Sequence, residues 1–111
     1  MRQWLMLFCL TLTLQPEHVK RVIDGDTFVL FHVGIKGEEH VRLSGVDTPE
    51  KKSPGADEAT AFTVAWLKQG PSEFTTCKRD DFGRLLASVV RGRESLSGAL
   101  IESGLVHAIT R

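Results

Sequence analysis

The chain has 111 residues, of which 41% are hydrophobic and 25% charged, which gives room for one globular core but not for two domains. Fourteen Lys and Arg balance fourteen Asp and Glu, so no global field steers the protein toward nucleic acid or an anionic membrane. Any recognition of phosphate must therefore be local.

The first fourteen residues, MRQWLMLFCLTLTL, form an apolar leader that is unlike the rest of the chain. The apolar run from Trp4 to Leu14 is too short to span a bilayer, which needs about 20 residues, but it fits a signal peptide after a positive start. This interpretation predicts a secreted or periplasmic protein whose domain covers residues 15–111; a cytoplasmic location is the alternative. No Ala-x-Ala cleavage pattern follows, and the segment also fits a buried first strand or a short core helix.

The chain contains two cysteines, Cys9 and Cys77, and four histidines. Cleavage of the leader would remove Cys9, so we expect the mature chain to hold a single thiol, with no disulfide and no cysteine metal site. The histidines show no ligand spacing, which argues against a zinc site.

Three strands are predicted in the first half of the chain. VKRVIDGDTFVL, residues 19–30, has two β-branched runs separated by Asp-Gly-Asp, as in a hairpin. Residues 31–37 hold two glycines in a second turn. EEHVRLSGV, residues 38–46, then alternates polar and apolar side chains as a third strand would.

A helix follows a loop at residues 49–55. ADEATAFTVAWLKQG, residues 56–70, repeats apolar side chains at spacings of three and four and carries acids in its first turn. Gly70 and Pro71 end the helix.

The second half predicts two more strands and a second helix. SEFTTC and LLASVV, residues 72–77 and 85–90, flank KRDDFGR, and a helical pattern runs from Ser95 to Gly104. The order β-β-β-α-β-β-α predicts an α+β, mainly β fold, a five-stranded barrel of OB type with two helices.

Acidic residues stand at the ends of two predicted strands. Asp24 and Asp26 lie in the first hairpin turn, where an Asp-Gly pair taken alone is ordinary turn chemistry. VDTPE, residues 46–50, follows the third strand, and Pro49 favours an extended conformation at Thr48.

These acids could form a cation site. Asp26 and Asp47 could bind one hard ion together with a backbone carbonyl and waters, as Ca²⁺ prefers. Glu50 would then be free to act on a water. In the alternative interpretation these residues have only structural roles: Asp47 or Thr48 caps a turn and Glu50 is a surface acid.

Two arginines extend this set. Arg42 lies in the third predicted strand, five residues before Asp47, and Arg84 follows DDFG, where Gly83 permits a turn. A guanidinium fork matches two phosphate oxygens and keeps its charge, so two forks could hold a phosphodiester and stabilise its developing charge.

Three segments, VIDGDT, VRLSGVDTPE and DDFGRLLASV, in this order, resemble the signature segments of the staphylococcal nuclease-like (thermonuclease) family. The resemblance runs from about Gln15 to Ala108. It implies a Ca²⁺-dependent nuclease that hydrolyses phosphodiester bonds of DNA or RNA. Water would attack in line with the leaving 5′ oxygen and leave 3′-phosphate ends.

The resemblance also implies a role for each matching residue. It assigns metal ligation to Asp26, Asp47 and Thr48, support of the metal to Asp24, activation of water to Glu50, and phosphate binding to Arg42 and Arg84. The implied substrate is DNA or RNA. We further expect a monomer with no stable protein partner and no membrane span.

The chain departs from the family in two respects. It has no Tyr; Phe82 stands where the family's best-known member has a nucleotide-contacting Tyr, and a Phe can stack on bases but not donate a hydrogen bond. Lys51 and Lys52 still offer positive charge to a nucleic-acid backbone. The family commonly continues with a third helix, which we expect to be missing here because the sequence stops at Arg111.

A catalytically inactive barrel that binds nucleic acid or a protein is the rival interpretation. Such a barrel would be expected to have lost some of the acids or arginines, and all six are present, which favours the enzyme.

Overall fold

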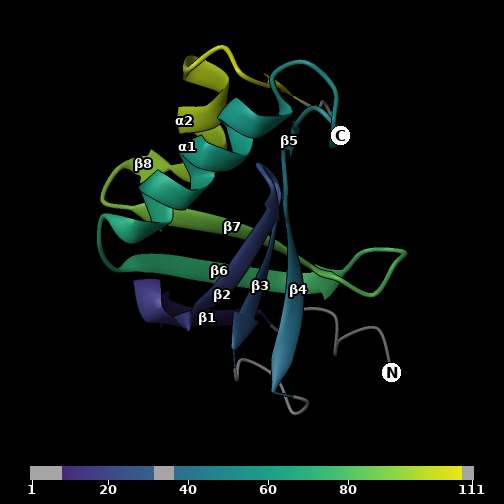
Figure 1. Ribbon diagram of the computed structural model, residues 1–111. Coiled ribbons are helices and arrows are strands. Elements are labelled where there is room, and N and C mark those ends of the chain that lie inside the picture. Colours follow the sequence, from purple (N-terminus) through teal and green to yellow (C-terminus); the bar gives the residue numbers. More distant parts are fainter. Residues whose placement is uncertain (1–8, 32–36, 109–111) are drawn as a thin grey trace.

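Strands from both halves of the chain form one strongly curved sheet in the computed structural model, which describes residues 9–31 and 37–108 (Figure 1). Two helices, α1 and α2, lie at one end of this sheet. The elements in chain order are β1 (Leu10–Leu14), the 3-10 helix η2 (Pro16–His18), β2 (Val19–Asp24), β3 (Thr27–Phe31), β4 (Glu38–Leu43), β5 (Val46–Asp47), α1 (Ala56–Lys68), β6 (Ser72–Arg79), β7 (Leu85–Arg91), β8 (Glu94–Ser95), α2 (Leu96–Glu102) and β9 (His107–Ala108).

The strand order agrees with the predicted α+β fold of OB type. The main sheet runs β1-β6-β7-β4-β3-β2, with β8 added to β7, and β5 pairs with β9 in a separate small sheet. The neighbours β4 and β7 are parallel, whereas the other pairs are antiparallel. The predicted strands and helices are confirmed, and the sheet is larger than the five strands expected.

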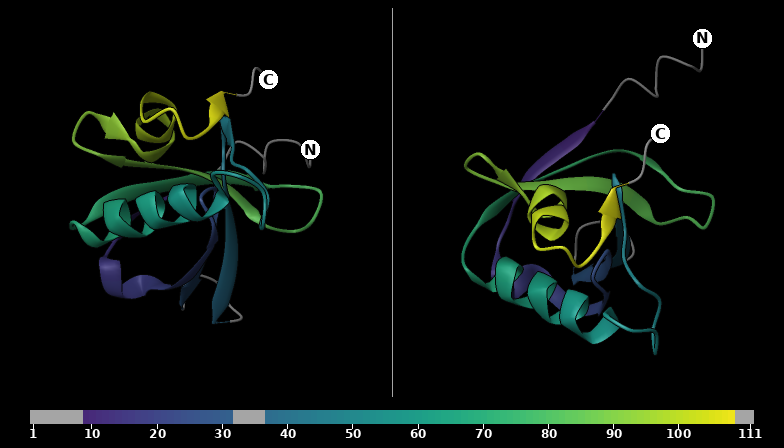
Figure 2. Two further views of the ribbon diagram at one scale, coloured as in Figure 1. Left: turned by 45° about the horizontal axis from the view of Figure 1, so that its top comes forward. Right: turned by 90° about the horizontal axis from the view of Figure 1, so that it is seen from above.

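The fold is of the predicted OB type, but among the described strands hydrogen bonds do not close the sheet on itself. The two edge strands are β1 and β2, which follow each other in the chain. Only Gln15 and η2 separate them, so the covalent chain bridges the open seam. Viewed from above, the strands curve around a common centre next to both helices (Figure 2).

Apolar side chains from the strands and helices meet in one core. In β6 and β7, buried and more exposed positions alternate, as expected of strands with one face on the core. In α1 the buried residues recur at helical spacing, with Ala59, Thr63 and Trp66 facing inward. The largest fully buried side chains are Phe28 and Phe74.

The described part of the leader is a strand of this domain. β1 pairs with β6 in antiparallel register from Leu10 opposite Thr76 to Leu14 opposite Ser72. Leu14 is 1% exposed and belongs to the core. The structure therefore agrees with the first-strand interpretation for these residues, whereas residues 1–8 lie outside the described part. No described helix is long and apolar enough to cross a membrane.

Cys9 and Cys77 form a disulfide, so the expectation of a single free thiol was wrong for the chain as it stands. That expectation assumed cleavage after residue 14. A leader cleaved there would take away both Cys9 and β1, so residues 9–14 cannot serve as a removed signal and as part of the folded domain at once.

The disulfide closes a long loop, and its loss should lower stability. Sequence separation between the two cysteines is 68 residues, and a cross-link of this length restricts the unfolded chain by about 2–4 kcal/mol. We expect Cys77→Ser to lower the urea midpoint by the corresponding amount. Dithiothreitol should shift the midpoint of the parent chain and leave that of Cys77→Ser unchanged; equal midpoints for the oxidised parent and the variant would contradict this.

Candidate active site

The turn between β2 and β3 is fixed by helix α1. The hydroxyl of Thr63, which is fully buried, donates to the Gly25 carbonyl at 2.6 Å. A Cβ added at Gly25 would lie 2.8 Å from Ala59 Cβ and 2.9 Å from Thr48 Cγ2, so only glycine lets the helix pack this closely. Sequence reasoning did not identify Thr63; the available signal was a polar residue on the apolar face of a helix.

The buried Asp26 carboxylate is oriented by hydrogen bonds from two threonines, Thr27 and Thr48. Its side chain accepts a hydrogen bond from the Thr27 hydroxyl through Oδ1 and one from the Thr48 N–H through Oδ2, both at 2.9 Å. The Asp26 carbonyl accepts from the Leu43 N–H at 2.8 Å. These bonds join the hairpin turn to both ends of the segment that follows β4.

Arg42 brings the two predicted metal-binding aspartates together. Its Nη1 lies 3.2 Å from Asp26 Oδ2, and its Nη2 lies 3.2 Å from Asp47 Oδ1. The same Nη1 donates to the carbonyls of Leu43 and Val46 at 2.8 Å each. Strand pairing explains the placement, because Arg42 stands opposite Thr27, next to Asp26.

Asp24 and Glu50 lie beside this cluster. Burial and the Asp26 carboxylate raise the pKa of Asp24 above its usual value. Glu50 adds to this effect, whereas Lys51 and Arg42 oppose it, so all four charges act on Asp24. The Glu50 side chain is exposed, and among the described residues its carboxylate has no hydrogen-bond partner.

The loop after Glu50 places two lysines near the acids. The Glu50 carbonyl accepts from the Ser53 N–H at 3.0 Å, which starts a turn. Lys51 and Lys52 are both exposed, and Lys52 has a positive φ of 72°. Neither lysine makes a hydrogen bond or ion pair within the described ranges.

Arg84 approaches from the neighbouring strand. Because β4 and β7 are parallel and Val41 is paired with Leu85, Arg84 lies beside the strand that carries Arg42. It makes no ion pair with Asp26 or Asp47 in the part of the chain that is described. Its guanidinium instead lies 5.3 Å from the centre of the Phe82 ring, and the Phe82 side chain is 83% exposed.

The oxygen donors of this cluster suit a hard cation such as Ca²⁺. Asp26, Asp47 and Thr48 would supply two carboxylates and a carbonyl, with no nitrogen or sulfur ligand. The Thr48 Oγ1 is buried without a hydrogen-bond partner among the described atoms, so a polar atom here is still unsatisfied. No group of three or more His, Cys, Asp or Glu in the described residues is arranged to hold a metal, so waters would have to complete the shell.

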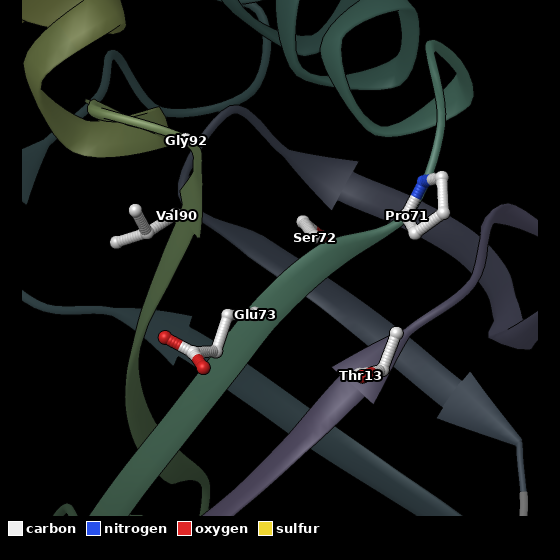
Figure 3. Close-up of a pocket in the computed structure, with 6 residues that line it drawn as sticks. All are labelled: Thr13, Pro71, Ser72, Glu73, Val90 and Gly92. Atoms are coloured by element: carbon white, nitrogen blue, oxygen red, sulfur yellow. The ribbon is translucent and has the colours of Figure 1, made fainter.

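A surface pocket of about 280 Å³ lies elsewhere, on β1, β6 and the β7–β8 turn (Figure 3). Its lining residues are Thr13, Pro71, Ser72, Glu73, Val90 and Gly92. The one charged side chain among them is the carboxylate of Glu73, which would repel a phosphate. This pocket therefore does not suit a nucleic-acid backbone.

A sequence model of one protein family, described as staphylococcal nuclease homologue, matches residues 40–111. The chain belongs to the staphylococcal nuclease family. The matched residues contain the segment from Arg42 to Glu50 and the hairpin with Arg84, while Asp24 and Asp26 precede them.

Curated relatives agree with this family. The chain is 39% identical over 98 residues to a thermonuclease from Staphylococcus intermedius, covering 81% of this chain and 57% of that protein. It is 35% identical over 102 residues to a thermonuclease from Staphylococcus hyicus, covering 85% and 59%. It is 34% identical over 96 residues to endonuclease YncB from Bacillus subtilis (strain 168), covering 78% and 44%. The chain thus spans less than two thirds of the length of these three relatives.

Proposed function

We propose that the chain is a Ca²⁺-dependent nuclease that hydrolyses phosphodiester bonds of DNA or RNA. The observation that carries the proposal is the cluster in which Arg42 lies 3.2 Å from a carboxylate oxygen of Asp26 and 3.2 Å from one of Asp47. A second guanidinium, that of Arg84, lies immediately before β7, the strand adjacent to β4. The names of the relatives, thermonuclease and endonuclease, support the same class of reaction.

In this mechanism the two guanidinium groups bind non-bridging oxygens of the scissile phosphate. Their fixed charges stabilise the negative charge that grows as water adds to phosphorus. Glu50, whose carboxylate is exposed, accepts a proton from the attacking water, which is aligned with the leaving 5′ oxygen. The leaving 5′ oxygen takes up a proton from solvent, so the products are a 5′ hydroxyl and a 3′ phosphate, and no covalent intermediate is needed.

Asp26, Asp47 and the Thr48 carbonyl would hold the Ca²⁺, and Asp24 would support them. The ion, when bound, supplies charge neutralisation at a phosphate oxygen. Arg42 already holds both carboxylates in place by its contacts with Asp26 and Asp47.

Three exposed residues near the cluster are proposed to contact the rest of the nucleic acid. Lys51 and Lys52 would pair with backbone phosphates. The exposed Phe82 ring would stack on a base. The substrate is then held as a single strand by a monomer.

The disulfide supports an oxidising location. Disulfides persist outside the cytosol, where thiols are not kept reduced. We therefore propose a secreted or periplasmic location, in which Cys9 and β1 remain part of the protein.

Hydrolysis assays on the full chain test the proposed function. We expect cleavage of denatured DNA or of RNA with Ca²⁺, none with EGTA, and a loss of about 10²–10⁴-fold in kcat for Glu50→Gln, because general-base catalysis contributes about this much. Glu58→Gln, an exposed acid in the first turn of α1, is the matched control and should keep full activity. A folded chain that binds single strands without cutting them would overturn the enzyme and favour a binding module.

A further inference from the structure

The hairpin between β6 and β7 carries its own carboxylate, that of Asp80. Oδ1 of Asp80 accepts the backbone N–H groups of Phe82 and Arg84, both at 2.9 Å. Its Oδ2 accepts from Nε of Arg84 at 2.7 Å. One carboxylate therefore shapes the turn with one oxygen and holds the guanidinium with the other.

This arrangement leaves the two terminal nitrogens of Arg84 free to bind a ligand. Because Nε makes the bond to Asp80, the two terminal nitrogens remain for a ligand, and none of the described residues forms a hydrogen bond with them. The Phe82 ring lies 5.3 Å from Cζ and limits rotation from a second direction. A guanidinium fixed in this way does not lose side-chain entropy again when it binds phosphate.

The base of the hairpin is tied to β4. The Arg79 guanidinium pairs with both Glu39 oxygens at 3.0 and 2.9 Å and donates to the Gly83 carbonyl at 2.8 Å. These contacts add to the β6–β7 pairing at a place where the hairpin projects beyond the rest of the sheet (Figures 1 and 2). The turn that carries Arg84 is thus fixed relative to the strand that carries Arg42.

We propose that Asp80 is a positioning residue, which holds Arg84 with its terminal nitrogens directed at the scissile phosphate. This inference rests on the proposed nuclease function. It also distinguishes the two acids of DDFGR, since Asp81 is exposed and has no hydrogen bond or ion pair in the described residues.

The charge of Asp80 is maintained by the same contacts. Burial alone would raise the pKa of Asp80, but the N–H groups of Arg84 and Phe82 and the Arg84 guanidinium outweigh burial, so the pKa lies below its usual value. These contacts therefore favour the ionised form of Asp80 that the ion pair with Arg84 requires.

Asp80→Asn removes the ion pair with Arg84 but keeps the hydrogen bonds that shape the turn. The amide oxygen still accepts the two backbone N–H groups, whereas the amide nitrogen faces Nε–H and cannot accept its proton. We expect kcat/KM to fall about 10- to 100-fold, because misplacing a catalytic group by about 1 Å costs up to this much. Asp81→Asn, the matched control, should stay within about twofold of the parent, as expected of an exposed residue without contacts.

A double-variant cycle separates positioning from a structural role. If Asp80 acts through Arg84, then adding Asp80→Asn to Arg84→Lys lowers activity by less than about twofold, whereas independent effects would multiply. A full further loss in the double variant would overturn the proposal.

The Nε–H proton of Arg84 gives a readout that needs no activity. Nuclear magnetic resonance should show it shifted and protected from exchange in the parent and in Asp81→Asn, and lost to exchange in Asp80→Asn. An unchanged Arg84 signal in Asp80→Asn overturns the positioning role. An inactive parent chain with this pattern intact would instead overturn the nuclease function alone.

Discussion

Replacing Arg42 is expected to lower activity by orders of magnitude. Arg42→Lys should lower kcat/KM by about 10²–10³-fold, because one donor at a developing oxyanion is worth about 2.7–4 kcal/mol. Lysine keeps the charge but has no fork, so it cannot contact Asp26, Asp47 and the two carbonyls at once. Steady-state hydrolysis of single-stranded substrate measures the loss.

Arg42→Ala should add a loss of stability. Asp26 is 5% exposed, and removing its cationic partner leaves a buried carboxylate unpaired, at a cost of about 3 kcal/mol. Urea unfolding measures this loss of stability separately from activity. Arg21→Ala, which changes an exposed arginine of β2, is the control for loss of a positive charge. Activity of Arg42→Lys within about twofold of the parent would contradict a phosphate-binding role for the fork.

Local patterns were enough to predict most of the fold. The hairpin around Asp24 and Asp26 follows from β-branched runs and an Asp-Gly pair, and α1 follows from apolar spacing between Ala56 and Lys68. The geometry of the cluster also depends on how the strands pair, since the register of β3 with β4 sets Arg42 opposite Thr27. The sequence motifs named candidate site residues, and their roles stay a prediction. The motifs did not indicate that Arg42 would contact both aspartates.

Long-range pairing is what local patterns could not predict. An apolar leader has the same composition whether it is a signal peptide or an edge strand, and only its partner β6 distinguishes the two. The disulfide depends on that pairing across 68 residues. In DDFGR, Asp80 and Asp81 are equivalent by composition, and only the path of the turn brings Asp80 to Arg84.

The strand interpretation of the leader predicts that a chain starting at Gln15 will be strongly destabilised. Such a chain loses Leu14 from the core, all pairing of β1 with β6, and the disulfide. Burial of one leucine contributes about 1.5–3 kcal/mol and the cross-link about 2–4 kcal/mol. Their sum is of the order of the total stability of a small domain, about 5–15 kcal/mol.

Circular dichroism during urea unfolding measures this loss, with a chain that starts at Cys9 as the control. The control keeps β1 and the disulfide, so the difference between the two midpoints measures the contribution of residues 9–14. The chain from Gln15 should be largely unfolded or aggregated, because the exposed edge of β6 offers unpaired backbone groups to a second copy. If the chain from Gln15 unfolds at the same midpoint as the control, β1 is dispensable and removal of a fourteen-residue signal peptide becomes compatible with the fold.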